Sequence, residues 1–342
     1  MFLEKADTEQ PDALLRRLSR VSDQELGIDA RLLARACRTH RIAASHLALA
    51  PIQGTFHRLF DIHEPGHQPR LLRVSIFAGP DAAAAMALES RLIARLRVAS
   101  VPVPECTARP VADGDTVRGT QVTTRADGVL MGSLDSDETR MAAALALTAR
   151  LLDDVHRISG KGYGPLSVLP GQALTGIHQS WHDYLTARLE AHLQTCRMAA
   201  VITGSEAVDV ARYFRDPVSV IPREARLLHG DPGGHNVLIQ PSGVSALIDW
   251  EDALLGDPLF DVASLCCFHP ERRHPVIFRA LDLDMTPGTE LWRRFWLYFL
   301  RIAVARTVHR WRFGRPDTPG RPPAARRIQL ALARLAGRPV AA

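Results

Sequence analysis

The sequence lacks the features of a membrane-spanning or exported protein. No apolar run among its 342 residues reaches the roughly 20 residues that a membrane-spanning helix needs. Residues 1–7 lack the apolar core of a signal peptide. The cysteines are five in number and scattered, a pattern typical of a reducing compartment rather than of a disulfide framework. We therefore expect a cytoplasmic protein with no membrane partner.

Lysine is almost absent, and so is any concentrated basic segment. Lys5 and Lys161 are the only lysines, so the formal charge of +5 rests on arginine. No basic run with interleaved aromatic residues occurs, and we expect no nucleic-acid partner. The hydrophobic fraction of 46% and the charged fraction of 23% are those of an ordinary globular protein. Either a monomer or a homodimer is compatible with this composition.

The N-terminal part of the chain alternates between short strand patterns and turns. Leucines at helical spacing predict helix within residues 11–40, and a further alanine-rich helix is expected over 81–98. Strands are expected at residues 47–49, 56–62 and 71–77, near Cys106, and at 116–124. These elements predict an antiparallel sheet of five strands with one helix, in a lobe that spans residues 1–127.

From residue 128 onward the pattern becomes mainly helical, so the fold class is α+β with a second lobe over 128–342. Helices are expected over residues 141–158, from Ser180 onward and over 291–312, with a Pro/Gly-rich linker at 314–323 before a short terminal helix. One helix carries aromatic and apolar residues at helical spacing: Trp292, Phe295, Trp296, Phe299 and Ile302. Such a stripe usually forms core, although a ligand-facing surface stays open at this point.

The candidate catalytic and metal-binding residues are concentrated between residues 229 and 251. His229-Gly230-Asp231 is followed by Asn236 and then by Asp249, with a predicted hairpin between the last two. A hairpin of this kind can bring Asn236, before its first strand, close to Asp249, after its second. Phosphoryl transfer needs a proton acceptor and oxygen ligands for Mg²⁺, and protein kinases meet that need with Asp-x-x-x-x-Asn and a later Asp. The spacing here is the same.

These residues resemble the aminoglycoside phosphotransferase and choline kinase family of small-molecule kinases, and within it the antibiotic O-phosphotransferases of the hygromycin B type. The shared motif is His-Gly-Asp, then Asn, then Ile-Asp-Trp, and it is completed here by Gly256-Asp257 and Asp261. A second likeness lies in two upstream segments, Gly162-Tyr163-Gly164-Pro165 and Ser180-Trp181-x-Asp183-Tyr184-Leu185.

The resemblance implies a fold, a reaction and the roles of several residues. The fold is the two-lobed protein-kinase-like fold, with a small sheet-containing lobe and a larger helical one. Asp231 is expected to be the catalytic base, Asn236 and Asp249 to hold Mg²⁺, and Asp261 to brace the loop. The reaction is transfer of the γ-phosphoryl group of ATP or GTP to a hydroxyl of an antibiotic, which would confer resistance or self-protection. The sequence does not distinguish ATP from GTP.

The nucleotide side is predicted from the small lobe. Arg73 occupies the strand position where protein kinases carry lysine, and Glu89 on the following helix is its expected partner. The loop between the first two strands contains a single glycine, so it is a poor match to a glycine-rich phosphate loop. The remaining candidates for nucleotide contact are the loop residues Gly54 and Thr55 and the hinge residues Thr124, Arg125 and Ala126.

The acceptor side is less defined. Beside Asp231, the residues Glu251 and His235 are candidates for contact with a hydroxyl-rich or cationic acceptor. A metabolic kinase for choline, homoserine or a sugar is the alternative reading, and a non-catalytic pseudokinase is another, although the base and metal positions are intact. A metal-dependent hydrolase built on His229, Asp231, His235 and Asp249 would need imidazole ligands, whereas Asn with Asp suits Mg²⁺ better.

Overall fold

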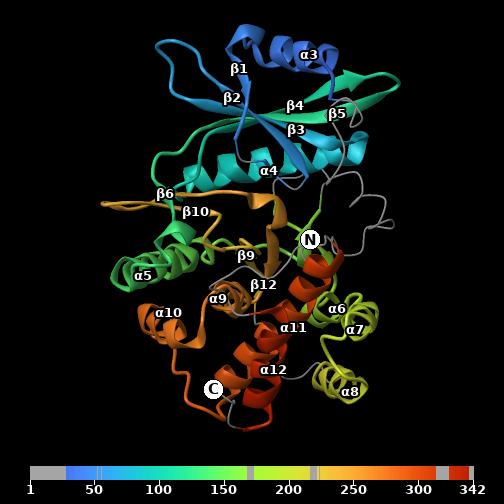
Figure 1. The fold of residues 1–342 in the computed structure, drawn as a ribbon, viewed down its shortest axis with the longest axis vertical. Coiled ribbons are helices and arrows are strands. Elements are labelled where there is room, and N and C mark those ends of the chain that lie inside the picture. The colour runs from blue at the N-terminus through green and yellow to red at the C-terminus, as the bar shows by residue number, and fades with distance from the viewer. Residues whose placement is uncertain are drawn as a thin grey trace. The chain divides into compact units, whose positions relative to one another are not determined.

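The computed structural model describes residues 28–51, 53–54, 56–167, 173–215, 222, 224–312 and 323–338, and these fall into two compact units. The first unit is Asp12–Gly128 together with Ser245–Glu251, and the second contains Val129–Val244 and Asp252–Ala342 (Figure 1). Residues 11–27 of the helical region expected within 11–40, and residues 314–322 of the linker expected at 314–323, lie outside the described residues.

The first unit is a single antiparallel sheet with helices on either side. Its elements are α3 (Ala30–His40), η1 (Ala44–His46), β1 (Leu47–Leu49), β2 (His57–Ile62), β3 (Arg70–Ala78), α4 (Pro80–Val98), β4 (Cys106–Asp113) and β5 (Thr116–Thr124). The strand order is β1-β2-β3-β5-β4, and each neighbouring pair is antiparallel. The five-stranded sheet predicted from the sequence is therefore confirmed.

Packing against the sheet explains the position of α4. Its apolar residues Met86, Leu92, Ile93 and Leu96 are buried, and the helix contacts β3, β4 and β5. Gly119 on β5 allows this approach, since a Cβ there would lie 2.8 Å from the Met86 sulfur. Figure 1 shows α3 and α4 on opposite sides of the sheet. The register places Arg73 in the middle of β3 and directly opposite Gln121 of β5, at the centre of this layer.

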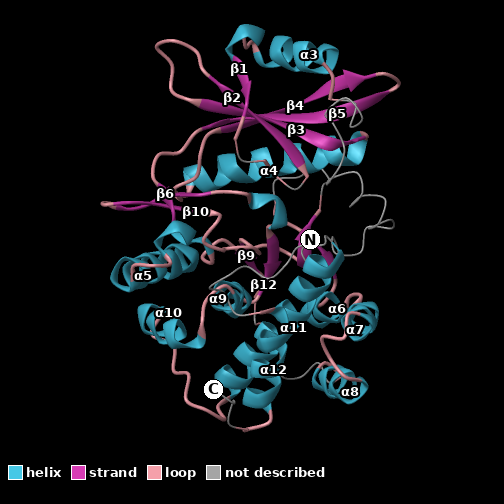
Figure 2. Cartoon of the chain, in the orientation of Figure 1, coloured by secondary structure: helices cyan, strands magenta, loops and turns pink. Residues whose placement is uncertain are grey.

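The second unit is mainly helical (Figure 2). Its elements are β6 (Val129–Leu130), η2 (Met131–Leu134), α5 (Glu138–Val155), β7 (Tyr163–Leu166), β8 (Gly176–His178), α6 (Trp181–Thr186), α7 (Leu189–Met198), α8 (Gly204–Tyr213), β9 (Arg226–Leu228), β10 (Val237–Gln240), β12 (Leu254–Gly256), α9 (Pro258–Cys267), η5 (Glu271–Arg273), α10 (His274–Ala280), α11 (Glu290–Arg312) and α12 (Ala324–Leu335). Between β10 and β12, the elements β11 (Gly243–Leu247) and η4 (Trp250–Asp252) carry the chain through the segment assigned to the first unit. None of the helices in the described part of the chain is long and apolar enough to cross a membrane.

The centre of the second unit is α9, which is buried from Leu259 to Cys267. The long helix α11 packs on α9, α12 and α7. On α11, Phe295, Trp296 and Phe299 are at most 4% exposed, so the core interpretation of this aromatic stripe is confirmed for these residues. Burial of three large aromatic side chains is a major part of the hydrophobic stabilisation of this unit.

The residue types in the segment that begins at Ser180 are also explained by packing in the core. Ser180 caps α6 by accepting a hydrogen bond from the Asp183 N–H, and Trp181 is 2% exposed. The Trp181 indole N–H donates to the Tyr298 hydroxyl at 2.9 Å, and that hydroxyl donates to Asp257 at 2.8 Å. A Cβ at Gly256 would lie 2.2 Å from the Trp181 ring. Position 256 must therefore be glycine to leave room for the Trp181 ring. The motif that contains Trp181 and the motif that contains Gly256-Asp257 are thus in direct contact.

Candidate active site

The residues predicted for the nucleotide side centre on a buried ion pair in the first unit. Arg73 Nη1 donates to both carboxylate oxygens of Glu89 at 3.0 Å and to Gln121 Oε1 at 2.8 Å. Gln121 Nε2 also donates to Glu89 at 3.1 Å. Burial by itself would lower the pKa of Arg73, but the carboxylates of Glu89, Asp249 and Glu251 outweigh it and raise the pKa above its ordinary value. Arg73 is thus a fixed positive charge, partnered by Glu89 as predicted.

Asp249 is joined to this pair within the same unit. Arg73 Nη2 lies 3.4 Å from Asp249 Oδ1, and the N–H of Trp250 donates to Glu89 at 3.2 Å. The segment is anchored further back by a hydrogen bond from the Leu247 N–H to the Pro102 carbonyl at 2.8 Å. Asp249 has a φ of +65°, in the left-handed region that is unfavourable for a residue with a Cβ. Strained backbone of this kind is concentrated at functional positions.

The loop before β2 is held by a side chain rather than by several glycines. Gln53 Nε2 donates to the carbonyls of Ala50 at 2.7 Å and Leu59 at 3.0 Å, and Gln53 Oε1 accepts from the Leu59 N–H at 3.0 Å. Gly54 follows, and a Cβ there would lie 3.2 Å from the His57 carbonyl oxygen. Thr55 lies outside the described residues. The sequence reasoning did not single out Gln53, although it is the residue that ties this loop to β2.

His57 and Glu251 meet beside Arg73. His57 Nδ1 lies 3.6 Å from Glu251 Oε2 and 3.4 Å from Arg73 Nη2. Glu251, predicted from the sequence to face the acceptor, therefore lies beside residues predicted for the nucleotide side. Its role toward an acceptor stays a prediction.

The expected hinge follows β5. The N–H groups of Thr124 and Arg125 donate to the carbonyls of Glu105 at 2.9 Å and Pro69 at 2.8 Å. The Arg125 side chain forms an ion pair with Asp61. Among the described residues no hydrogen bond uses the Ala126 backbone. Contact of these three residues with an adenine edge stays a prediction.

In the second unit, the loop of Asp231 is braced from α9. Asp261 is fully buried, and its carboxylate accepts from the N–H groups of His229 at 2.7 Å and Gly230 at 2.9 Å. His156 Nε2 lies 3.0 Å from the same carboxylate. Gly230 has a φ of +85°, and a Cβ there would lie 2.2 Å from the Asp252 carbonyl oxygen. The glycine where protein kinases carry arginine is therefore a steric requirement of this backbone.

Both carboxylate oxygens of Asp231 are engaged. Oδ1 accepts from Arg306 Nη2 at 2.6 Å, and Oδ2 lies 3.0 Å from His235 Nε2. Burial by itself raises the pKa of Asp231, but Arg306 and His235 outweigh it and hold the pKa well below its ordinary value. Asp231 is therefore ionised at neutral pH, as a residue that accepts a proton must be.

Asn236 is arranged as a candidate ligand for a cation. It is 3% exposed, and its Nδ2 donates to the Asp231 carbonyl at 2.9 Å, with Asp231 Oδ2 at 3.5 Å. Both of these side-chain hydrogen bonds use the nitrogen, so the amide oxygen is the atom that can meet a metal. An amide oxygen and a carboxylate are hard donors of the type that Mg²⁺ takes. The described residues contain no group of three or more His, Cys, Asp or Glu side chains that could hold a metal.

A comparison with known protein families assigns the chain to one of them. A model of the phosphotransferase enzyme family (APH) matches residues 48–294, more than half of the chain. The chain belongs to this family. The match covers Arg73, Glu89 and the whole of the segment from His229 to Asp261.

Two individual proteins to which the chain is similar are each less than 30% identical to it. Hygromycin-B 4-O-kinase of Escherichia coli is 28% identical over 178 residues, which are 46% of this chain and 49% of that protein. The chain thus spans about half the length of this curated relative. A thermostable variant of aminoglycoside phosphotransferase APH(4)-Ia, in ternary complex with AMP-PNP and hygromycin B, is 23% identical, with a TM-score of 0.62 over 86% of this chain and 95% of the other.

The fold is also similar to that of a solved structure with another name. A putative fructosamine-3-kinase from Thermobifida fusca has a TM-score of 0.57 at 17% identity, over 87% of this chain and 99% of the other. Together with APH(4)-Ia, it shows that the chain has the α+β, protein-kinase-like fold of the phosphotransferase family.

Arg306 is a second residue of the candidate site, after Gln53, that sequence reasoning missed. It lies on α11, 75 residues beyond Asp231, so no local spacing connects the two. The available signal was an arginine inside a buried helical run, since Ile302 to Ala305 and Val308 are at most 1% exposed. Charged residues are seldom placed in such a run unless they are paired.

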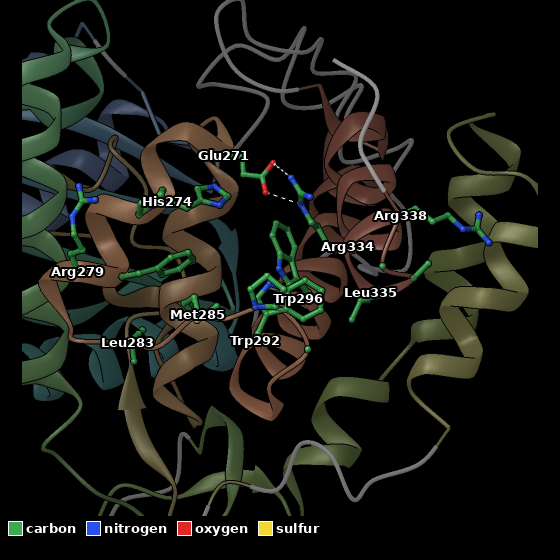
Figure 3. A pocket seen from close by; sticks show the side chains of 16 residues that line it. Glu271, His274, Arg279, Leu283, Met285, Trp292, Trp296, Arg334, Leu335 and Arg338 are labelled. Carbon is green, nitrogen blue, oxygen red and sulfur yellow. Dashed lines mark hydrogen bonds and ion pairs between the residues drawn. The ribbon is translucent and has the colours of Figure 1, made fainter.

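A pocket elsewhere in the second unit is separate from these residues. It has a volume of about 950 Å³ and is formed by α10, the start of α11 and the end of α12 (Figure 3). Trp292 and Trp296 line it, and the Glu271–Arg334 ion pair closes one side. None of the residues predicted for catalysis lines this pocket.

Proposed function

We propose that this protein transfers the γ-phosphoryl group of a nucleoside triphosphate to a hydroxyl of a small molecule. The observation that supports this most directly is the pair of Asp231 and Asn236 on a loop braced by Asp261, within a chain of the phosphotransferase family. Asp231 is an ionised carboxylate, as is needed to orient a hydroxyl and accept its proton, and Asn236 has its amide oxygen beside it. A pseudokinase would have no need to keep this set.

The roles fall on residues of both units. Asp231 orients the acceptor hydroxyl and takes its proton, and Asn236 and Asp249 are the ligands for Mg²⁺. When bound, Mg²⁺ neutralises charge that develops on the phosphoryl oxygens. Arg73, held by Glu89, pairs with nucleotide phosphates, while Gly54 and Thr55 of the preceding loop and Thr124, Arg125 and Ala126 of the hinge surround the nucleotide. Residues 1–127 thus form the nucleotide-binding lobe, and 128–342 carry the catalytic loop and the acceptor site.

The acceptor is an antibiotic hydroxyl, on an aminoglycoside or on a nucleoside- or sugar-containing compound. Similarity to hygromycin-B 4-O-kinase supports this class. His235 lies 3.0 Å from Asp231 and is 45% exposed, so it can meet the acceptor. The protein would act in the cytoplasm, where the nucleotide donor and a reducing environment for its free cysteines are both found.

The test is direct. The full chain is incubated with Mg²⁺, ATP or GTP, and a panel of hygromycin B, other aminoglycosides, nucleoside antibiotics, choline, homoserine and sugars. Mass spectrometry is expected to find one added phosphoryl group on an antibiotic, and Asp231→Asn is expected to reduce its formation by about 100- to 10,000-fold. Absence of product with every acceptor, together with absence of magnesium-dependent nucleotide binding, would exclude the proposed function.

A further inference from the structure

Asp231 is held by two side chains of very different character. Arg306, at its Oδ1, has a side chain that is 11% exposed, whereas His235, at its Oδ2, has a side chain that is 45% exposed. Arg306 arises from the C-terminal half of a 23-residue helix, and His235 from the loop of Asp231 itself, four residues after Asp231. One oxygen of the carboxylate is therefore fixed from the core, and the other meets a side chain at the surface.

Arg306 is itself fixed on several sides. Its guanidinium lies 3.7 Å above the centre of the Phe268 ring, and Nη2 also donates to Ser264 Oγ at 3.2 Å. Ser264 is 1% exposed, and its hydroxyl lies 3.4 Å from the Gly230 carbonyl oxygen. The planar guanidinium is suited to stack on a ring and to bond in its own plane at the same time, which a lysine cannot do.

The contacts around the carboxylate close into a ring. Phe268, which lies under Arg306, also meets the His235 ring edge-on, with centroids 5.3 Å apart. The order around this ring is Arg306, Asp231, His235, Phe268 and back to Arg306. Rotation of the Asp231 carboxylate would break a 2.6 Å ion pair on a rigid helix, so the direction in which Oδ2 points is set by Arg306.

We propose that Arg306 is a positioning residue for phosphoryl transfer: by holding Oδ1 of Asp231, it leaves Oδ2 as the atom that receives the acceptor hydroxyl. The inference rests on the proposed function. In the reaction the acceptor oxygen bonds to the γ-phosphorus, and the bond from that phosphorus to the bridging oxygen breaks. The nucleoside diphosphate leaves with the electron pair. The hydroxyl proton passes to Oδ2 and then to solvent.

The kinetic test compares Arg306→Met, Arg306→Lys and Arg306→Ala with a control on the same helix, Arg293→Met, whose side chain is exposed. A misplaced base lowers kcat, so Arg306→Met is expected to lose about 100-fold in kcat, with the KM for nucleotide unchanged. Arg306→Lys recovers part of the loss. Added guanidinium ion raises kcat of Arg306→Ala and leaves that of Arg293→Met unchanged. Equal kcat values for Arg306→Met and Arg293→Met would overturn the proposal.

A structural measurement keeps the test independent of activity. Crystal structures of the wild type and Arg306→Met are expected to differ in the direction of the Asp231 carboxylate, and an acceptor complex is expected to have the hydroxyl on Oδ2. An unchanged carboxylate in Arg306→Met would refute positioning, whether or not the wild type transfers phosphoryl groups. Absence of transfer by the wild type would refute the proposed function. The direction of the Asp231 carboxylate would then show by itself whether Arg306 positions it. If Arg306→Met does not fold, Phe268→Leu removes the ring beneath the guanidinium, and the same reorientation with a smaller loss of kcat is expected.

Discussion

Replacement of Arg73 by methionine should destabilise the first unit strongly, because it leaves a buried carboxylate without its ion-pair partner. Glu89 is 3% exposed, so water cannot take the place of the guanidinium. Breaking a buried ion pair by removing one partner costs about 3–5 kcal/mol in the free energy of unfolding. Gln121 Nε2 and the Trp250 N–H still donate to Glu89, at 3.1 and 3.2 Å. We therefore expect a loss near the lower limit, about 3 kcal/mol.

A second substitution separates the lost charge from the lost packing. Glu89→Gln alone should cost about 2 kcal/mol, because Arg73 keeps its contacts with Gln121 and Asp249. The double variant has neither charge in the core and should also lose about 2 kcal/mol rather than the sum of the two, giving a coupling of about 3 kcal/mol. The change lies within one unit, and native-state hydrogen exchange of the β3 and β5 amides measures the opening of that unit specifically.

A matched control lies on the same strand. Arg70 pairs with Glu64, and these side chains are 27% and 15% exposed, so Arg70→Met should cost no more than about 1 kcal/mol. The reasoning fails if Arg73→Met costs no more than Arg70→Met. It also fails if the effects of Arg73→Met and Glu89→Gln add within about 0.5 kcal/mol, since residues in one network should couple.

Three further predictions follow from single features of the two units. The free energy of unfolding, measured in urea, should be about 1 kcal/mol higher for Asp249→Gly than for Asp249→Ala, because glycine accepts the φ of +65° and alanine does not. Equal free energies of unfolding would contradict backbone strain at this position. Asp261→Asn should lower kcat and reduce stability by about 2–3 kcal/mol, as seen in urea unfolding, because two backbone N–H groups lose a charged acceptor. Burial, with Arg109 and Arg70, lowers the pKa of His40 to about 4, so between its ordinary value of 6.5 and about 4 the unfolded chain binds more protons. Stability of the first unit should therefore fall as the pH drops through that window, and His40→Gln should remove this slope in amide exchange measured from pH 7 to pH 4.

The sheet was predictable because each strand carries its own signal. Alternation and turn residues predicted a strand over residues 116–124, and β5 spans Thr116–Thr124. Helix ends were less accurate, since the helix expected over residues 141–158 begins at Glu138 and ends at Val155. Its start is set by Asp137, which accepts a hydrogen bond from the Arg140 N–H, a capping signal that the apolar spacing alone does not contain.

The sequence prediction of the candidate site rests on residues that are close in sequence. Asp231, Asn236 and Asp249 follow one another on a loop and a hairpin, and their roles as base and metal ligands stay predictions. Arg306 comes from a distant helix, and its contact with Asp231 depends on how α11 packs on α9. Trp181 illustrates the opposite case, because a segment identified by its resemblance to antibiotic kinases is explained by burial against Gly256.

Assignment of Ser245–Glu251 to the first unit limits how chains of this type can recombine. A single crossover near residue 128 between two relatives would combine Arg73 and Glu89 of one parent with Asp249 and Trp250 of the other. The buried charge network of such a hybrid comes from two parents, and it stays intact only if the two parents have the same residues at these positions. Crossovers on both sides of 245–251 transfer the network whole. Among hybrids made by gene shuffling within the family, we therefore expect the folded ones to have residues 245–251 and the N-terminal part from the same parent, although the two segments are far apart in the gene.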